Sequence, residues 1–151
     1  MASVNYKEQL AALVDSMLQE GLLDEQFTQL QTLQDETSPG FVAEVIAMFC
    51  GDTGTVFNEI ETIMNQAVID FQNVDPLVHR LKGSSCTVGA PKMKLACVQY
   101  RQFRDANDRQ GCLSAVNLIK DEYNILRNKF ETMLNLERMI QAGGTNKPNG
   151  K

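Results

Sequence analysis

The chain has 151 residues, of which 43% are hydrophobic and 22% charged, and its formal net charge is −5. This composition is typical of one folded domain and excludes fibrous and disordered chains. No run approaches the roughly 18 apolar residues of a membrane span, and the acidic balance argues against nucleic acid as a partner. The N-terminus lacks the basic start and apolar stretch of a signal peptide, so we expect a cytoplasmic and nuclear protein.

Helix is predicted for almost the whole chain, because apolar residues recur at every third or fourth position without the alternation of strands. Ser38-Pro39 and Asp75-Pro76 each resemble a helix cap followed by a first-turn proline. We expect the third helix to run continuously through Gly51 and Gly54. The predicted helices span about 4–20, 24–35, 39–70, 75–89, 91–107 and 110–142.

Short turns between the last four helices predict an antiparallel up-down four-helix bundle over about 39–142, an all-α fold. The two N-terminal helices would cover one end or side of it. The last helix is expected to stop at Gly143-Gly144, which gives a single domain over 1–142 and a disordered tail over 143–151.

The only histidine of the chain, His79, is predicted to lie on the outward face of the fourth helix. At about 100° per residue, four neighbours fall opposite it and would face the bundle. These four are Leu77, Leu81, Ser84 and Val88. The residues that fall on the His79 side are Lys82, Gly83 and Cys86. His79 is therefore expected to be exposed rather than part of the core.

Gly83 lies one turn from His79, although a glycine inside a helix costs about 1 kcal/mol relative to alanine. A residue that disfavours the helix without any structural benefit indicates a functional role at that position. With no side chain beside the imidazole, a partner's active site has room to close over His79. Lys82 can reach the same space and offset the charge of a phosphoryl group.

The chemistry open to this site is limited, because the sequence has no second histidine, no glycine-rich phosphate loop and no clustered metal ligands. A neutral exposed imidazole is nonetheless a competent nucleophile. If a partner supplied an acyl phosphate and Mg²⁺, His79 could take the phosphoryl group in line. The chain would then be a phosphate carrier rather than an enzyme, with no cofactor of its own.

The segment from His79 to Ser85, HRLKGSS, followed by Val88-Gly89-Ala90, resembles the signature of plant histidine-containing phosphotransfer (HPt) proteins. The resemblance implies a carrier in multistep phosphorelays. Its partners would be receiver domains of hybrid histidine kinases and response regulators, often in cytokinin signalling, with Mg²⁺ held by the receiver. Some plant members lack the histidine and act as inhibitors, whereas this chain retains it.

On that resemblance His79 is the phosphoacceptor, Lys82 the cation beside the phosphate and Gly83 the clearance residue. The residues expected to border the docking face are Arg80, Ser85 and Cys86. Arg80 stands where glutamine is common in the family, which adds charge to that face. We expect a monomer that binds neither nucleic acid nor membrane.

The charge pattern favours an acidic partner. The segment 79–109 holds seven basic and two acidic residues and so carries 7 − 2 = +5, which leaves −10 on the rest of the chain. Solvated helix faces that happen to be basic explain this statistic equally well. Other functions stay open: an adaptor that docks receiver domains without transfer, a helical scaffold with an incidental histidine, and, more remotely, a DNA-binding bundle.

The four cysteines show no CxxC or Cys/His spacing, so we expect reduced, mostly core-filling thiols and no metal site. Two of them suggest a redox hypothesis. Cys86 should border the docking face, and Cys112 follows Gly111 at a helix start, where the helix dipole lowers a thiol pKa.

Overall fold

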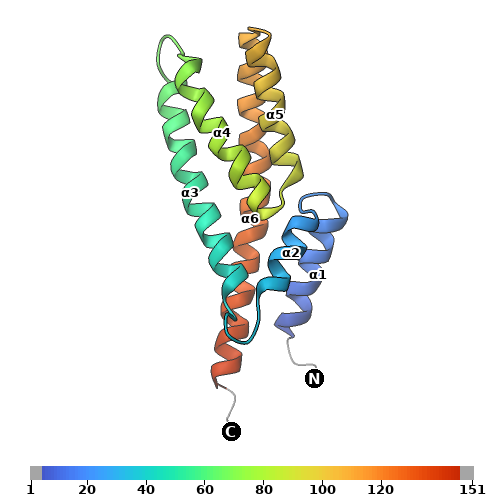
Figure 1. Cartoon of the computed structure of the whole chain (residues 1–151). Coiled ribbons are helices and arrows are strands. Elements are labelled where there is room, and N and C mark those ends of the chain that lie inside the picture. Colours follow the sequence, from blue (N-terminus) through green and yellow to red (C-terminus); the bar gives the residue numbers. More distant parts are fainter. Residues whose placement is uncertain (1–4, 147–151) are drawn as a thin grey trace.

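The computed structural model describes residues 5–146, and within that range every regular element is an α-helix. The helices alternate in direction along the chain and are joined by short turns (Figure 1). Their bounds are α1 Tyr6–Gln19, α2 Glu25–Leu33, α3 Phe41–Met64, α4 Phe71–Val88, α5 Pro91–Asp105 and α6 Arg109–Asn146.

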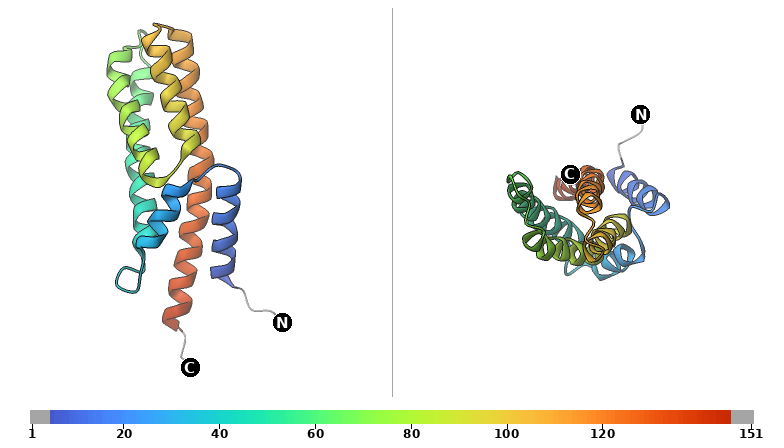
Figure 2. Two further views of the ribbon diagram at one scale, coloured as in Figure 1. Left: turned by 45° about the vertical axis from the view of Figure 1, so that its right-hand side comes forward. Right: turned by 90° about the horizontal axis from the view of Figure 1, so that it is seen from above.

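The last four helices form the predicted antiparallel up-down bundle, with the long α6 running along its whole length (Figure 1). The short helices α1 and α2 lie beside the half of α6 that extends beyond α4 and α5, as both side views show (Figure 2). α1 packs on α6, while α2 contacts α3 and α4. The all-α fold with two additional N-terminal helices is confirmed.

The boundary between α3 and α4 was predicted wrongly. α3 ends at Met64 rather than near residue 70, and α4 begins at Phe71 instead of at Asp75-Pro76. The N-cap is Asp70, whose carboxylate accepts a hydrogen bond from the backbone N–H of Gln72 at 3.0 Å. Helix from residue 71 onward buries Phe71, so Pro76 lies inside α4, where it removes one backbone donor.

The C-terminal boundary also differs, because α6 continues through Gly143-Gly144 to Asn146. Gly143 keeps a negative φ, so it does not form the left-handed cap with which glycine ends a helix. Residue 4 of the first predicted helix and residues 147–151 of the predicted tail lie outside the described residues.

The predicted continuity of α3 through Gly51 and Gly54 is confirmed, and Tyr123 of α6 packs against the middle of this helix, where a Cβ on Gly54 would make only an ordinary contact. The Tyr123 hydroxyl donates to the Cys50 carbonyl at 3.1 Å, and a Cβ on Gly54 would lie 3.8 Å from that hydroxyl. The Tyr123 ring stacks on Phe57 and meets Phe49 edge-on. α3 and α6 are thus joined in the bundle core by aromatic packing of Tyr123 on Phe49 and Phe57.

Gly89 fixes the end of α4 against the N-terminal helices. It adopts a left-handed conformation at φ 72°, and its carbonyl accepts from the Asp24 N–H at 2.9 Å. A Cβ at this position would lie 2.5 Å from Asp24 Oδ1 and 2.6 Å from the Phe27 nitrogen. Only glycine allows both the backbone conformation and this close approach, so α2 is held at the α4–α5 turn.

Candidate functional site

The helix α4 presents His79 to solvent, as its periodicity predicts. The opposite side of the helix packs against α2, α3 and α5. The buried residues of α4 are Phe71, Val74, Leu77, Val78, Leu81, Ser85 and Val88. Because neighbouring helices cover only one side of α4, the imidazole of His79 is accessible to solvent. The backbone of His79 is nonetheless fixed, since it belongs to a helix that packs in the bundle.

Gly83 lies on the same exposed side of α4, one turn beyond His79. A Cβ built on Gly83 would meet no atom within 4 Å, and the residue has an ordinary helical φ. No packing requirement of the chain therefore calls for glycine here. The absent side chain leaves open space on the exposed face of α4 beside His79.

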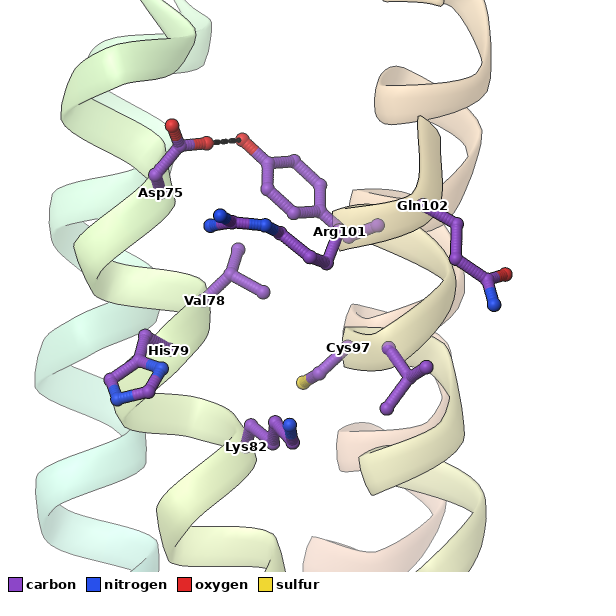
Figure 3. Close-up of a pocket in the computed structure, with 9 residues that line it drawn as sticks. Asp75, Val78, His79, Lys82, Cys97, Arg101 and Gln102 are labelled. Carbon is purple, nitrogen blue, oxygen red and sulfur yellow. Dashed lines mark hydrogen bonds between the residues drawn. The ribbon is translucent and has the colours of Figure 1, made fainter. Parts of the chain in front are cut away.

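A groove of about 370 Å³ runs between α4 and α5 and has His79 on its rim (Figure 3). Its floor is made by the buried side chains of Val78, Cys97 and Tyr100. The exposed residues along its two rims are His79 and Lys82 from α4, and Arg101 and Gln102 from α5. The imidazole, predicted to lie on the outward face of its helix, thus also borders a concave surface.

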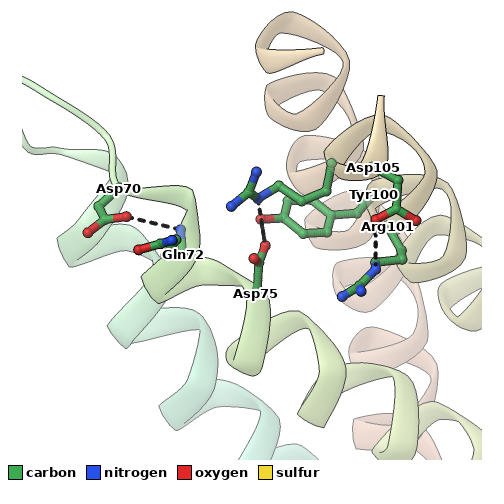
Figure 4. Close-up of polar contacts among 7 residues, drawn as sticks. Asp70, Gln72, Asp75, Tyr100, Arg101 and Asp105 are labelled. Carbon is green, nitrogen blue, oxygen red and sulfur yellow. Dashed lines mark hydrogen bonds and ion pairs between the residues drawn. The ribbon is translucent and has the colours of Figure 1, made fainter. Parts of the chain in front are cut away.

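Asp75 connects α4 to α5 one turn before His79, instead of capping a helix as predicted. Its Oδ1 accepts hydrogen bonds from the Tyr100 hydroxyl at 2.8 Å and from the Arg104 Nε at 3.0 Å (Figure 4). Burial, and then the hydrogen bond to Asp75, raise the pKa of Tyr100. This cluster links α4 to α5 beside the groove through two side-chain hydrogen bonds.

The predicted docking residues do not all lie on the surface. Arg80 and Cys86 are exposed, but Ser85 is fully buried and its hydroxyl donates to the Leu81 carbonyl at 2.7 Å. The expectation that Ser85 borders the docking face is therefore wrong. The sequence predicted that the buried side of this helix lies directly opposite His79. In the structure the buried side of α4 is rotated toward Ser85, so Ser84 is only half-buried.

The four cysteines are free thiols in different environments. Burial raises the pKa of Cys97 to about 12, and it also raises the pKa of Cys112. The expectation that the helix dipole lowers the Cys112 pKa is thus wrong, because the thiol is 1% exposed and desolvation dominates. Cys86 is exposed, so its predicted place beside the docking face stays open as a hypothesis.

Two general properties of residues 5–146 bear on the class of site. No three side chains of His, Cys, Asp or Glu in this range come close enough together to hold a metal ion. None of the helices in the described range is both long and apolar enough to cross a bilayer.

Comparison with known proteins assigns the chain to a family. The Hpt domain matches residues 44–129, which run from α3 well into α6 and include His79. The chain belongs to the histidine-containing phosphotransfer (HPt) family. It is 52% identical to histidine-containing phosphotransfer protein 2 of rice over 143 residues, which is 94% of this chain and 96% of that protein.

Other HPt proteins extend the likeness to structure. Histidine-containing phosphotransfer protein 1 of Arabidopsis is 40% identical over 95% of this chain and 94% of its own length. The crystal structure of the maize HPt protein superposes with a TM-score of 0.83 at 49% identity and covers 90% of this chain and 99% of its own. This HPt chain functions as a histidine phosphotransfer protein in a phosphorelay, where the family interacts with receiver-domain kinases and response regulators.

Sequence reasoning missed the α5 side of this HPt site. It identified the His79 face of α4, but it took Asp75 only for a helix cap. Arg101 and Arg104 counted only as part of the basic segment 79–109. A four-residue spacing does place Cys97, Arg101 and Asp105 on one face of α5. Helix packing decides which side of α4 this face of α5 contacts, and no local sequence pattern predicts that contact.

Proposed function

We propose that His79 is the phosphoacceptor through which this protein receives a phosphoryl group from the receiver domain of a hybrid histidine kinase and passes it to response regulators. The observation that carries the proposal is the placement of the sole histidine: exposed on the groove rim, beside a glycine with open space around it. We extend the proposal to cytokinin signalling, the pathway that the resemblance to plant HPt proteins implies.

The transfer is an in-line displacement. The lone pair of a neutral imidazole nitrogen of His79 attacks the phosphorus of the receiver's aspartyl phosphate, a P–N bond forms, and the P–O bond to the aspartate breaks. The aspartate leaves as a carboxylate, and a Mg²⁺ ion held by the receiver would offset the charge of the phosphoryl oxygens. The reverse displacement on a second receiver passes the group on.

Each of the two α4 neighbours has one task in this scheme. Lys82 lines the same groove as His79 and supplies a positive charge next to the phosphoryl group. Gly83 gives the receiver's active site clearance to reach the imidazole. The exposed Arg80 and Cys86 border the docking face. The chain supplies a positioned nucleophile while its partner supplies the metal ion, so we class it as a phosphocarrier rather than an enzyme.

The remaining proposals concern where the protein acts and in what form. We expect a monomer, because transfer requires only the α4–α5 face of one chain, and we expect it in both cytoplasm and nucleus. Net acidic charge and the absence of a recognition-helix pattern in the basic segment argue against nucleic acid as a partner.

His79→Gln tests the proposal directly. The variant should fold with an unchanged circular dichroism spectrum, because the side chain is exposed, yet it should take no label from a ³²P-phosphorylated receiver. The label on the unaltered protein should be lost in acid and kept in alkali, as expected of a phosphoramidate bond. Label retained by the variant would refute the assignment. Receiver binding without any label on the unaltered protein would indicate a non-transferring adaptor.

A further inference from the structure

A second groove lies away from His79, between the start of α3 and the C-terminal end of α6 (Figure 1). Its volume is about 550 Å³, and it shares no lining residue with the α4–α5 groove. The small and apolar residues that line it are Gly40, Ala43, Ala47 and Leu134. Because glycine and alanine supply almost no bulk, α3 leaves this side of α6 uncovered, and a Cβ built on Gly40 would meet no atom within 4 Å.

A further hollow, lined by α1, α2 and α6, joins this α3–α6 groove around the end of α6. Its volume is about 630 Å³, and it shares Pro39, Glu137 and Gln141 with the groove. Figure 2 shows α1 on one side of α6 and α3 on the other in this half of the molecule. From Gly40 to Ala47 the groove is about 10 Å long at a rise of 1.5 Å per residue, which matches about two turns of a docked helix. An extended surface of this kind suits a partner helix better than a small molecule, which proteins enclose.

Glu137 lies where the two hollows meet, and its side chain is half-buried. Burial raises the pKa of this carboxyl group, and within residues 5–146 it has no hydrogen bond or ion pair. The neighbouring Arg138 donates instead to the Asn135 side chain at 2.5 Å. A partly desolvated carboxylate without a partner is costly, and a cation brought by a binding partner would remove that cost.

The charges around Glu137 also favour a positive partner. The acidic residues that line the two hollows are Asp35, Glu36, Glu44 and Glu137, and the basic ones are Lys7 and Arg138. The lining therefore carries 2 − 4 = −2. This balance attracts cationic groups and disfavours acidic surfaces, an anionic membrane included.

We propose that the α3–α6 groove docks a helix of a partner protein, which presents small apolar side chains to Ala43 and Ala47 and a lysine or arginine to Glu137. Apolar residues spaced by three or four along the partner helix fill the groove, and the ion pair fixes the register of that helix. The interaction goes beyond phosphoryl transfer. It uses none of the residues of the α4–α5 groove and needs no phosphoryl group on His79.

The test uses three synthetic peptides of about 15 residues, a length at which an isolated helix begins to be stable. Each peptide has alanine and leucine on one face and glutamine on the other, and the centre of the apolar face holds lysine, glutamine or glutamate. Titration into the ¹⁵N-labelled full chain should shift the amide resonances of residues 40–47 and 134–141. The lysine peptide should bind about tenfold more tightly than the glutamine peptide, and the glutamate peptide should bind most weakly.

Glu137→Gln should abolish the preference for lysine, so that the lysine and glutamine peptides bind within about twofold of each other. Glu122→Gln is the matched control, because Glu122 is also half-buried on α6 but lines neither hollow. It should keep the preference for lysine. Ala47→Gln tests the groove itself: the residue is exposed, so the variant should keep its circular dichroism spectrum, while the longer side chain should weaken binding of every peptide by about tenfold.

Equal affinity of the lysine and glutamine peptides for the unaltered protein would overturn the proposal, as would shifts confined to other surfaces. Shifts of residues 40–47 that depend on protein concentration without any peptide would assign the groove to self-association and refute a partner helix. Binding of n-butylammonium as tight as that of the lysine peptide would refute it in favour of a small-cation site. His79→Gln should bind the lysine peptide like the unaltered protein, so failure of this proposal and failure of the phosphoacceptor assignment are distinguishable.

Discussion

Substitutions of Gly83 should change the stability of the fold and the rate of phosphoryl transfer in different ways. It lies inside α4, has an ordinary helical φ, and has no atom within 4 Å of where a Cβ would be. Gly83→Ala should therefore stabilise the fold by up to about 1 kcal/mol through helix propensity alone. In a chain of this size that gain corresponds to a rise of about 2 to 4 °C in the thermal midpoint.

Gly83→Gln should keep roughly half of that stabilisation, because glutamine is an ordinary helix former. Its side chain, however, fills the space beside His79 and should slow transfer from a phosphorylated receiver by about tenfold or more, equivalent to about 1.4 kcal/mol in the barrier. Phosphorylation by the small donor phosphoramidate should change little, because that molecule does not need the clearance that a protein partner needs.

Gly51 provides the control. It is an exposed glycine in the interior of α3, and a Cβ there also meets nothing within 4 Å. Gly51→Gln should raise the thermal midpoint as Gly83→Gln does, and it should leave receiver transfer unchanged. Thermal melts followed by circular dichroism and single-turnover transfer kinetics check both variants. Undiminished receiver transfer in Gly83→Gln, or an equal loss in Gly51→Gln, would refute the clearance argument.

Three further predictions concern charge, packing and pH. Association with a receiver should slow as salt rises, and Lys82→Ala and Arg80→Ala should each weaken that dependence in stopped-flow measurements; rates independent of salt would exclude electrostatic steering. Asp75→Ala should cost about 1 to 3 kcal/mol in urea unfolding, because the buried Tyr100 hydroxyl loses its acceptor, and a change near zero would contradict the role of this cluster. Burial raises the pKa of Cys97 to about 12 from an ordinary value of 9.0, so its contribution to stability is fully present below pH 9 and is lost progressively as pH rises from 9 toward 12. Each pH unit in that window should cost at most about 1.4 kcal/mol, and Cys97→Ala should flatten the slope measured by denaturant titration at several pH values.

Local sequence patterns were sufficient to predict the six helices of the described range, though not all of their ends, and the exposure of His79. The apolar stripe of α6, from Cys112 to Met133, is buried as its spacing predicts, because a helix turns every 3.6 residues whatever it packs against. The same periodicity places His79 and Gly83 on the accessible side of α4. Lys82 and Gly83 were identified as site residues for the same reason, since both lie within one turn of His79.

Tertiary packing decided the rest. The sequence predicted Asp75 as the cap of the fourth helix, whereas in the structure Asp70 caps α4, Phe71 is buried, and Asp75 binds Tyr100 and Arg104. Ser85 rather than Ser84 is buried because α4 contacts three other helices, which rotates its buried stripe. The groove beside His79, and the placement of Arg101 on its far rim, depend on how α4 and α5 align. Periodicity along one helix determines which of its residues lie on the same side. It does not determine which side of a neighbouring helix those residues will contact.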